Sequence, residues 1–391
     1  VAAPLATPGR AHWRDLVPHR PGVFILSHLV LADWLIRLER ADSLPRIVVR
    51  RLDSGEEHTI AFDEEAYSLG VEYGYEFATD TLRFGYSSMT TPTETWDYDL
   101  AKRTRILRKR REVPSGHNPS DYVTRRLFAP AADGETVPVS VLYHKDTPLD
   151  GTAPGFVYGY GAYGISIPAA FNSDRLSLAD RGFVFAIAHV RGGTDKGWRW
   201  YREGKLAAKP NTFADFIAAT EHLVGARFIA PGKIVAQGGS AGGMLIGAIA
   251  NMRPDLYAGL IAEVPFVDVL DTMLDDTLPL TPPEWFEWGN PITDAKAFQT
   301  ILSYSPYDNV REQPYPALLA LAGLTDPRVT YWEPAKWVAR LRARTTGDKP
   351  ICLRTNLEAG HQGAAGRFER LKEIALAYAF AIKAAGMLPA R

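Results

Sequence analysis

The amino-acid sequence predicts an α/β fold, a doubly wound and mostly parallel sheet, preceded by a smaller antiparallel β region. Three observations lead to this prediction. Short segments rich in β-branched and aromatic residues fill the chain up to about residue 111, and strand-like and helix-like segments alternate after about residue 120. A glycine-lined turn at 238–243 joins an apolar segment to a helix-like one. With 391 residues, 46% of them hydrophobic, the chain allows one large domain or two ordinary ones.

The N-terminal region divides into two similar series of four expected strands. They are residues 22–26, 34–38, 46–49 and 58–62, and then 73–77, 81–86, 95–98 and 105–107. Each series covers about 45 residues, the size of a four-stranded propeller blade. Complete propellers need roughly 4–8 blades, so we expect an incomplete β-propeller of about two. Either further blades precede Val1 in a longer parent protein, or these strands are exposed at an edge. The chain starts at Val1 rather than Met, as a processed chain or a fragment would, and the number of blades favours a fragment.

A linker separates this region from the rest of the chain. Residues 102–111 hold seven basic residues in ten, which is typical of a nucleic-acid or import segment or of a solvated strand. The net charge of −1 favours the solvated strand, so we expect no nucleic-acid partner. Six of the nine residues at 112–120 are the turn formers Pro, Ser, Gly and Asn. We therefore expect partial propeller blades and a linker at 1–115 and a second domain at 116–391.

Other bulk properties narrow the class of protein. Cys352 is the single cysteine, which excludes an intrachain disulfide and favours a reducing, cytoplasmic compartment. The chain contains no run of about 18 apolar residues, so we expect no membrane span. Its first residues lack the charged and apolar regions of a signal peptide.

The second region alternates strands with helices. Expected strands are 122–129, 136–144, 156–158, 183–188, 234–236, 317–322 and 351–354, and expected helices are 212–224, 333–344 and 367–385. The first two strands flank an Asp133–Gly134 turn and are expected to be antiparallel, whereas the continuous apolar runs fit buried parallel strands. The last helix is expected to turn Phe368, Leu371, Ala375 and Tyr378 inward. Ligands of such sheets bind at the carboxyl ends of the strands.

Ser240 lies in the glycine-lined turn, within a G-x-S-x-G pattern at 238–242. This pattern is typical of the nucleophile elbow of α/β-hydrolases, in which a strained turn lifts a serine hydroxyl above the sheet. The helix N-terminus behind it offers free N–H groups to a developing oxyanion. The alternative is a glycine-rich strand–helix turn without chemistry. The matching strand and helix on either side favour the elbow, and with it the α/β-hydrolase fold.

Asp326 and His361 are the candidate partners of Ser240. α/β-Hydrolases order their triad as serine, acid, histidine. Asp326 follows the strand expected at 317–322, and His361 follows the one at 351–354, so both lie on the rim that carries Ser240. His361 would take the serine proton and Asp326 would orient the imidazole. A turn aspartate and a loop histidine are the alternatives, and order and strand-end placement favour catalysis.

The sequence indicates no metal or cofactor. Asp268, Asp271 and Asp275 have helical spacing, but no histidine or cysteine joins them. A solvated acidic face explains them better than an ion site. Neither a phosphate-binding glycine loop nor zinc spacing occurs in the sequence.

From about Trp13 to its end, the chain closely resembles the oligopeptidase B branch of the prolyl oligopeptidase family of serine peptidases. The resemblance rests on QGGSAGGM (237–244), NMRPDL (251–256), VPFVD (264–268), EWGNP (287–291), YSPYDNV (304–310) and YWEPAKWV (331–338). It implies a propeller that caps an α/β-hydrolase domain and admits only short peptides. It also implies that the N-terminal blades and the extreme N-terminal segment of the full enzyme lie outside these residues.

The resemblance also implies roles for individual residues. The nucleophile, aspartate and histidine of the family fall on Ser240, Asp326 and His361. Its oxyanion hole, a tyrosine hydroxyl and the N–H after the serine, falls on Tyr160 and Ala241. Arg328 stands where relatives hold a substrate carbonyl.

This chain departs from the pattern around the expected specificity pocket. The branch holds a basic residue before the scissile bond with two glutamates separated by one residue. Glu284 matches the first glutamate, and Phe286 replaces the second. A further acidic pair, for the residue one position earlier, falls on Pro168 and Ala170. The resemblance therefore implies a basic preference that is weaker than usual, with Phe286 stacking on the substrate guanidinium.

Smaller departures lie elsewhere. Gln362 replaces a glycine after the histidine, and Thr194–Asp195 replaces Gly–Glu. The leading hypothesis is a serine endopeptidase that cleaves short peptides after Arg or Lys through an acyl-enzyme. The alternatives are an esterase-type hydrolase, because one triad serves both reactions, and a catalytically silent fragment that binds partners through its residual strands. We expect short peptides as ligands and no membrane partner.

Overall fold

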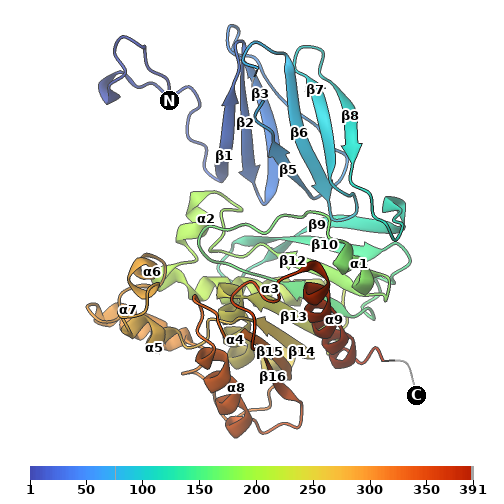
Figure 1. Cartoon of the computed structure of the whole chain (residues 1–391), viewed down its shortest axis with the longest axis vertical. Helices are drawn as coiled ribbons and strands as arrows, with labels where there is room; N and C mark the ends of the chain where they lie inside the picture. Colours follow the sequence, from blue (N-terminus) through green and yellow to red (C-terminus); the bar gives the residue numbers. More distant parts are fainter. Residues whose placement is uncertain (75, 389–391) are drawn as a thin grey trace.

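The computed structural model describes residues 1–74 and 76–388, and it has two parts (Figure 1). Two four-stranded antiparallel sheets stand side by side in the first part, and an eight-stranded sheet with helices on both faces forms the second. The strands of the first part are β1 Val23–Val30, β2 Trp34–Ala41, β3 Leu44–Arg51, β4 Glu57–Thr59, β5 Tyr67–Val71, β6 Thr81–Ser88, β7 Glu94–Asp99 and β8 Thr104–Arg110.

Each small sheet joins sequence neighbours, in the orders β1-β2-β3-β4 and β5-β6-β7-β8, as in propeller blades. Their facing sides share a core that includes Trp34, Ile36, Val49 and Phe84. The strand expected at 73–77 is wrong: β5 is Tyr67–Val71, residues 73, 74, 76 and 77 are not in a strand, and Tyr75 lies outside the described residues. β5 carries Tyr67 into the shared core, which decides its position.

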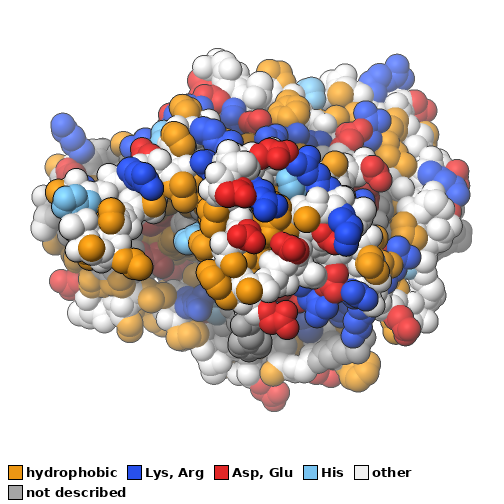
Figure 2. All heavy atoms as spheres, turned by 90° about the horizontal axis from the view of Figure 1, so that it is seen from above, with side chains coloured by type: hydrophobic (Ala, Val, Ile, Leu, Met, Phe, Trp, Pro, Cys, Tyr) orange, Lys and Arg blue, Asp and Glu red, His pale blue; other side chains and the backbone are white. Residues whose placement is uncertain are grey.

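The basic run at 102–111 forms the outer strand β8, whose side chains are mostly exposed. Acidic side chains of the adjacent β7 neutralise part of it, with Arg108 Nε 2.6 Å from Asp97 Oδ2 and Arg110 2.7 Å from Glu94 Oε1. Basic and acidic side chains are likewise intermixed on the face seen from above (Figure 2). This charge pattern is that of a solvated strand.

The second part holds the other strands and the helices. The strands are β9 Tyr122–Pro130, β10 Thr136–His144, β11 Gly155–Tyr158, β12 Val184–Ala188, β13 Ile234–Gly239, β14 Gly259–Glu263, β15 Ala317–Gly323 and β16 Ile351–Asn356. The helices are α1 Ser173–Ala179, α2 Trp198–Arg202, α3 Pro210–Gly225, α4 Ala241–Met252, α5 Val269–Leu274, α6 Thr281–Trp288, α7 Ala295–Tyr304, α8 Trp332–Arg344 and α9 Arg367–Ala384. The proposed domain boundary near residue 115 falls between β8 and β9.

The eight strands have the order β16-β15-β14-β13-β11-β12-β10-β9. β10 is antiparallel to both of its neighbours, and the pairs from β12 to β16 are parallel. Residues of α3, α4 and α8 pack in the core on one face, and residues of α1 and α9 pack on the other. The fold is therefore the doubly wound α/β-hydrolase fold, and its strand order turns at β11 and β13, where ligands of such sheets bind.

Helix α9 presents only part of the expected face to the sheet. Tyr378 packs against Phe156 as expected, whereas Phe368 and Leu371 are 76% and 42% exposed and Ala375 is exposed too. Ala377 and Ala381 are buried instead. At its C-terminal end α9 approaches the sheet closely: a Cβ on Gly259 of β14 would lie 2.7 Å from the Cβ of Ala384. Of the described helices, none is both long and apolar enough to cross a bilayer.

Candidate active site

Ser240 occupies a strained turn between β13 and α4. Its φ of 55° and ψ of −118° are rare for a residue with a side chain. Backbone bonds hold this conformation, from Ser240 N to Glu263 O at 2.8 Å and from Phe266 N to Ser240 O at 3.1 Å. A Cβ on Gly238 would lie 2.3 Å from the Gly242 carbonyl oxygen, so the turn closes only with these glycines.

His361 and Asp326 form a hydrogen-bonded pair. His361 Nδ1 lies 2.7 Å from Asp326 Oδ2, while Asp326 Oδ1 accepts the backbone N–H groups of Arg328 and Val329 at 2.8 and 3.0 Å. Burial would raise the pKa of Asp326, but the bonds from His361 and the two N–H groups bring it below its ordinary value. The carboxylate is thus held ionised against the imidazole.

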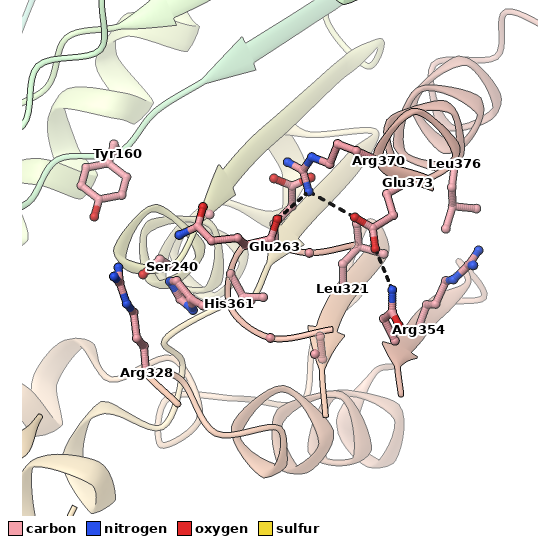
Figure 3. A pocket seen from close by; sticks show the side chains of 18 of the residues that line it. Tyr160, Ser240, Glu263, Leu321, Arg328, Arg354, His361, Arg370, Glu373 and Leu376 are labelled. Carbon is pink, nitrogen blue, oxygen red and sulfur yellow. Dashed lines mark hydrogen bonds and ion pairs between the residues drawn. The ribbon is translucent and has the colours of Figure 1, made fainter. Parts of the chain in front are cut away.

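A cavity of about 300 Å³ brings Ser240 and His361 together, and their side chains lie at the same end of it (Figure 3). We name this space the histidine lobe. Gln362, which the sequence placed beside the site, lines it as well. His361, the expected base, therefore lines the same cavity as Ser240. Asp326 is hydrogen-bonded to Nδ1 of the His361 imidazole.

Tyr160 lies in the loop after β11 and also lines the histidine lobe. Burial, together with Tyr158 and Glu284, raises the pKa of its hydroxyl to about 12, so the group remains a proton donor at neutral pH. Gly161 follows it with a φ of 78°, and a Cβ there would lie 2.3 Å from a methyl of Thr212. Ala241 begins α4, where the first backbone N–H groups of a helix have no intrahelical acceptor.

A second cavity of about 350 Å³ opens on another side of Ser240, and Glu284 lies on its wall. We name it the glutamate lobe. Glu284 Oε2 accepts hydrogen bonds from Tyr163 Oη and Trp288 Nε1, each at 2.6 Å. Phe266, Met273 and other apolar residues line the same space. A largely apolar cavity with a carboxylate on its wall suits a long side chain that ends in a cation.

Phe286 is not part of this cavity, which corrects the expectation that it stacks on a substrate guanidinium. Its side chain is 81% exposed and does not line the glutamate lobe. Glu284 and Trp288 are one turn apart on α6 and face inward together. A residue two positions after Glu284 points about 200° away from it around the helix.

The remaining residues that the sequence singled out differ in whether they line the two lobes. Arg328 is exposed and lines both lobes, together with Ser240 and Tyr160. Pro168 and Ala170 line neither lobe. Thr194 and Asp195 are buried at the contact with the first part, where Ser43 N donates to Asp195 O at 2.7 Å.

Three further charged residues of the site were missed by sequence reasoning. Glu333 lines the glutamate lobe and accepts the N–H groups of Val267 and Asp268, each at 3.0 Å, and burial raises its pKa to about 8. Glu263 lines the histidine lobe, and Lys209 is buried beneath the Tyr160 loop. The only local signal was a charge at the edge of an apolar run, which is also common on surfaces.

The aspartates considered as an ion site have protein partners. Lys336 Nζ donates to both Asp268 and Asp271, to the latter at 3.1 Å. Asp275 instead accepts the N–H and hydroxyl of Thr277. In the part of the chain that the structure describes, no three histidine, cysteine or acidic side chains are grouped to hold a metal ion.

Comparison with known proteins gives consistent matches. The model of the prolyl oligopeptidase family matches residues 169–388, and that of the prolyl oligopeptidase N-terminal beta-propeller domain matches 1–111. Dipeptidyl aminopeptidase BI of Pseudoxanthomonas mexicana is 45% identical over 388 residues, which are 99% of this chain and 53% of that protein.

Two solved structures are also similar over nearly the whole chain. Oligopeptidase B from Leishmania major has a TM-score of 0.91 at 41% identity, covering 98% of this chain and 55% of that one. Oligopeptidase B from Trypanosoma brucei with covalently bound antipain has a TM-score of 0.89 at 43% identity, covering 97% and 55%. The chain thus spans about half the length of the relatives it matches.

Proposed function

The chain belongs to the prolyl oligopeptidase family, and we propose that it is a serine oligopeptidase that cleaves short peptides after arginine or lysine. One arrangement carries the proposal. His361, hydrogen-bonded to Asp326, lines the same cavity as Ser240, and Ser240 occupies a strained turn before α4. A serine, a base and an orienting acid in this arrangement are what acyl transfer requires.

The proposed reaction has two steps. His361 Nε2 accepts the Ser240 hydroxyl proton while Oγ attacks the peptide carbonyl, and the same proton then goes to the departing amine as the C–N bond breaks. Asp326 stabilises the imidazolium. Water then attacks the acyl-enzyme ester with His361 as base, and His361 returns that proton to Ser240 Oγ as the C–O bond breaks and the acid leaves. The Tyr160 hydroxyl and the Ala241 N–H donate to the oxyanion, and the raised pKa of Tyr160 keeps its proton in place.

Specificity for a basic residue rests on Glu284. Its two neutral donors both bond to Oε2, so Oε1 is left to receive a substrate cation. The apolar wall of the glutamate lobe, Phe266 included, covers the methylene stem of such a side chain. A planar guanidinium pairs with a carboxylate better than an ammonium does, so we expect arginine to be preferred to lysine.

The name of the Pseudoxanthomonas relative motivates a second mode, removal of dipeptides from a free N-terminus. Hydrolysis of simple esters and partner binding without catalysis are the competing functions. A fluorophosphonate probe labels only an activated serine, so labelling of wild type but not of Ser240→Ala is expected. Rates on arginyl arylamides with free and blocked N-termini, and on simple acyl esters, then distinguish the reactions. Absence of labelling would contradict the proposal.

A further inference from the structure

The two lobes meet at Ser240 and differ in chemistry. Ser240, Tyr160 and Arg328 line both, whereas His361 lines only the histidine lobe and Glu284 only the glutamate lobe. A substrate bound across Ser240 therefore has a different cavity on each side of the bond that is cut.

The position of His361 tells which lobe receives the leaving group. A general acid must lie next to the nitrogen that it protonates. With Glu284 holding the residue before the scissile bond, the histidine lobe lies on the side of the residue that follows it. The chemistry of the histidine lobe then determines which leaving groups suit the enzyme.

Glu263 is a carboxylate of this lobe that lies close to the backbone of the nucleophile. It ends β14, its backbone oxygen accepts the Ser240 N–H, and its Oε2 would lie 3.8 Å from a Cβ built on Gly239. Its side chain is part of the cavity wall between the Ser240 end and Arg370 (Figure 3). Burial raises the pKa of Glu263, while Arg370 and Gln237 oppose the shift. A cation brought beside this carboxylate would favour its ionised form.

Of the other charges of the lobe, Arg370 and Glu373 pair with each other, whereas Arg328 and Arg354 have no ion-pair partner within residues 1–74 and 76–388. Arg370 bonds Glu373 Oε2 at 3.2 Å, and Glu373 also accepts Asn356 Nδ2 and the Ala364 N–H, both at 3.1 Å. Among the described residues, no Lys, Arg or His lies within ion-pair distance of Glu263. Arg354 lines the lobe too, and is drawn beyond Glu373 as seen from Ser240 (Figure 3).

We propose that the histidine lobe binds a lysine or arginine side chain directly after the scissile bond, with Glu263 as its counter-charge. This inference rests on the proposed peptidase function and adds a second basic position to it. With Glu284 on one side and Glu263 on the other, the preferred cleavage point lies between two basic residues.

The test uses quenched fluorescent peptides that differ only in the residue after the scissile arginine: lysine, norleucine or glutamate. Norleucine keeps the methylene chain of lysine and lacks the ammonium. The ratio of kcat/KM for lysine over norleucine is expected to be on the order of tenfold in wild type, because a charge-assisted bond is gained. Mass spectrometry of the products confirms which bond is cut.

Glu263→Gln is the decisive variant because it keeps the shape and removes the charge. Its lysine-to-norleucine ratio is expected to fall to about one. Glu369→Gln is the matched control, since Glu369 is exposed on α9, pairs with Lys372 and lies outside the lobe. This control should keep the wild-type ratio.

An arginyl arylamide, which has no residue after the scissile bond, separates this inference from the peptidase function on which it rests. If the arylamide is cleaved but the wild-type ratio is near one, or persists in Glu263→Gln, the inference fails and the peptidase function stands. A preference for glutamate after the scissile bond would contradict the inference and would indicate that Arg354, rather than Glu263, binds that side chain. If neither arylamide nor peptides are cleaved, both proposals fall.

Discussion

The Nζ of Lys209 donates a hydrogen bond to the carbonyl oxygen of Gly161, the residue after Tyr160, although the lysine is fully buried. It also donates to Gly204 O at 3.3 Å and lies 5.2 Å from the centre of the Trp288 ring. The ammonium thus connects the loop of the proposed oxyanion tyrosine to the helix of Glu284. Burial lowers the pKa of Lys209 to about 7, against the influence of Glu287.

This pKa predicts how stability depends on pH. Below about pH 7 both folded and unfolded protein carry the Lys209 proton, and between about 7 and 10 only the unfolded protein keeps it. Stability rises with pH where the unfolded state binds more protons. From pH 7 to 9, the unfolding free energy of wild type should rise relative to that of Lys209→Met, by at most about 1.4 kcal/mol per pH unit. Urea unfolding of both proteins measures it, and parallel pH profiles would contradict it.

Ser240→Ala should abolish hydrolysis and leave the fold intact. Alanine removes only the hydroxyl, and the backbone bonds that hold the turn remain. Loss of a triad serine costs roughly 10⁶ in kcat elsewhere. Turnover of an arginyl arylamide by pure protein, with circular dichroism as the control for folding, measures this. Retention of more than about a hundredth of wild-type turnover would show that Ser240 is not the nucleophile.

The value of kcat/KM should fall at acid pH, because the proposed base, His361, must be neutral to accept the Ser240 proton. Asp326, whose pKa is held below its ordinary value, stays ionised throughout and does not contribute to this fall. Its contribution to stability is present above its unfolded pKa and is lost as the pH falls through the folded one. The measurement is kcat/KM between about pH 5 and 8 on a substrate that does not titrate. A flat profile would remove His361 from the role of base.

Glu284→Gln should remove most of the preference for arginine, measured as the ratio of kcat/KM for arginyl over phenylalanyl peptides. A charge-assisted hydrogen bond contributes roughly 1.5–3 kcal/mol, or about 10–150-fold in selectivity between arginyl and phenylalanyl substrates. Phe286→Ala is the matched control on the same helix, and because Phe286 is 81% exposed we expect a change of less than about twofold. The readout is kcat/KM on peptides with Arg, Lys, Phe or Pro before the scissile bond. Equal rates for Arg and Phe, unchanged in Glu284→Gln, would show that Glu284 does not read the substrate.

Several features of this protein could be predicted from the sequence alone. The glycine pattern around Ser240 specifies a local turn, and the structure places Ser240 in that turn with a φ of 55°. Asp326 and His361 could be located because each follows an apolar strand, and the carboxyl ends of parallel strands share one edge. The α/β-hydrolase fold and the blades before it were predicted correctly because the periodicities of strands and helices are local properties of the sequence.

The tertiary structure alone decided how the surroundings of these residues are arranged. Phe286 and Glu284 are two positions apart in the sequence, and the docking of α6 through Trp288 determines which of them faces the cavity. Lys209 and Gly161 are brought together across 48 positions, and Glu263 reaches Ser240 through the pairing of β14 with β13. Such contacts depend on how packed elements approach one another, which the periodicity of a single helix does not specify: Phe368 and Leu371 of α9 are exposed although they share a face with Tyr378. The sequence thus predicted the residues of the proposed triad, whereas the cavities that Ser240 and His361 line exist only in the folded chain.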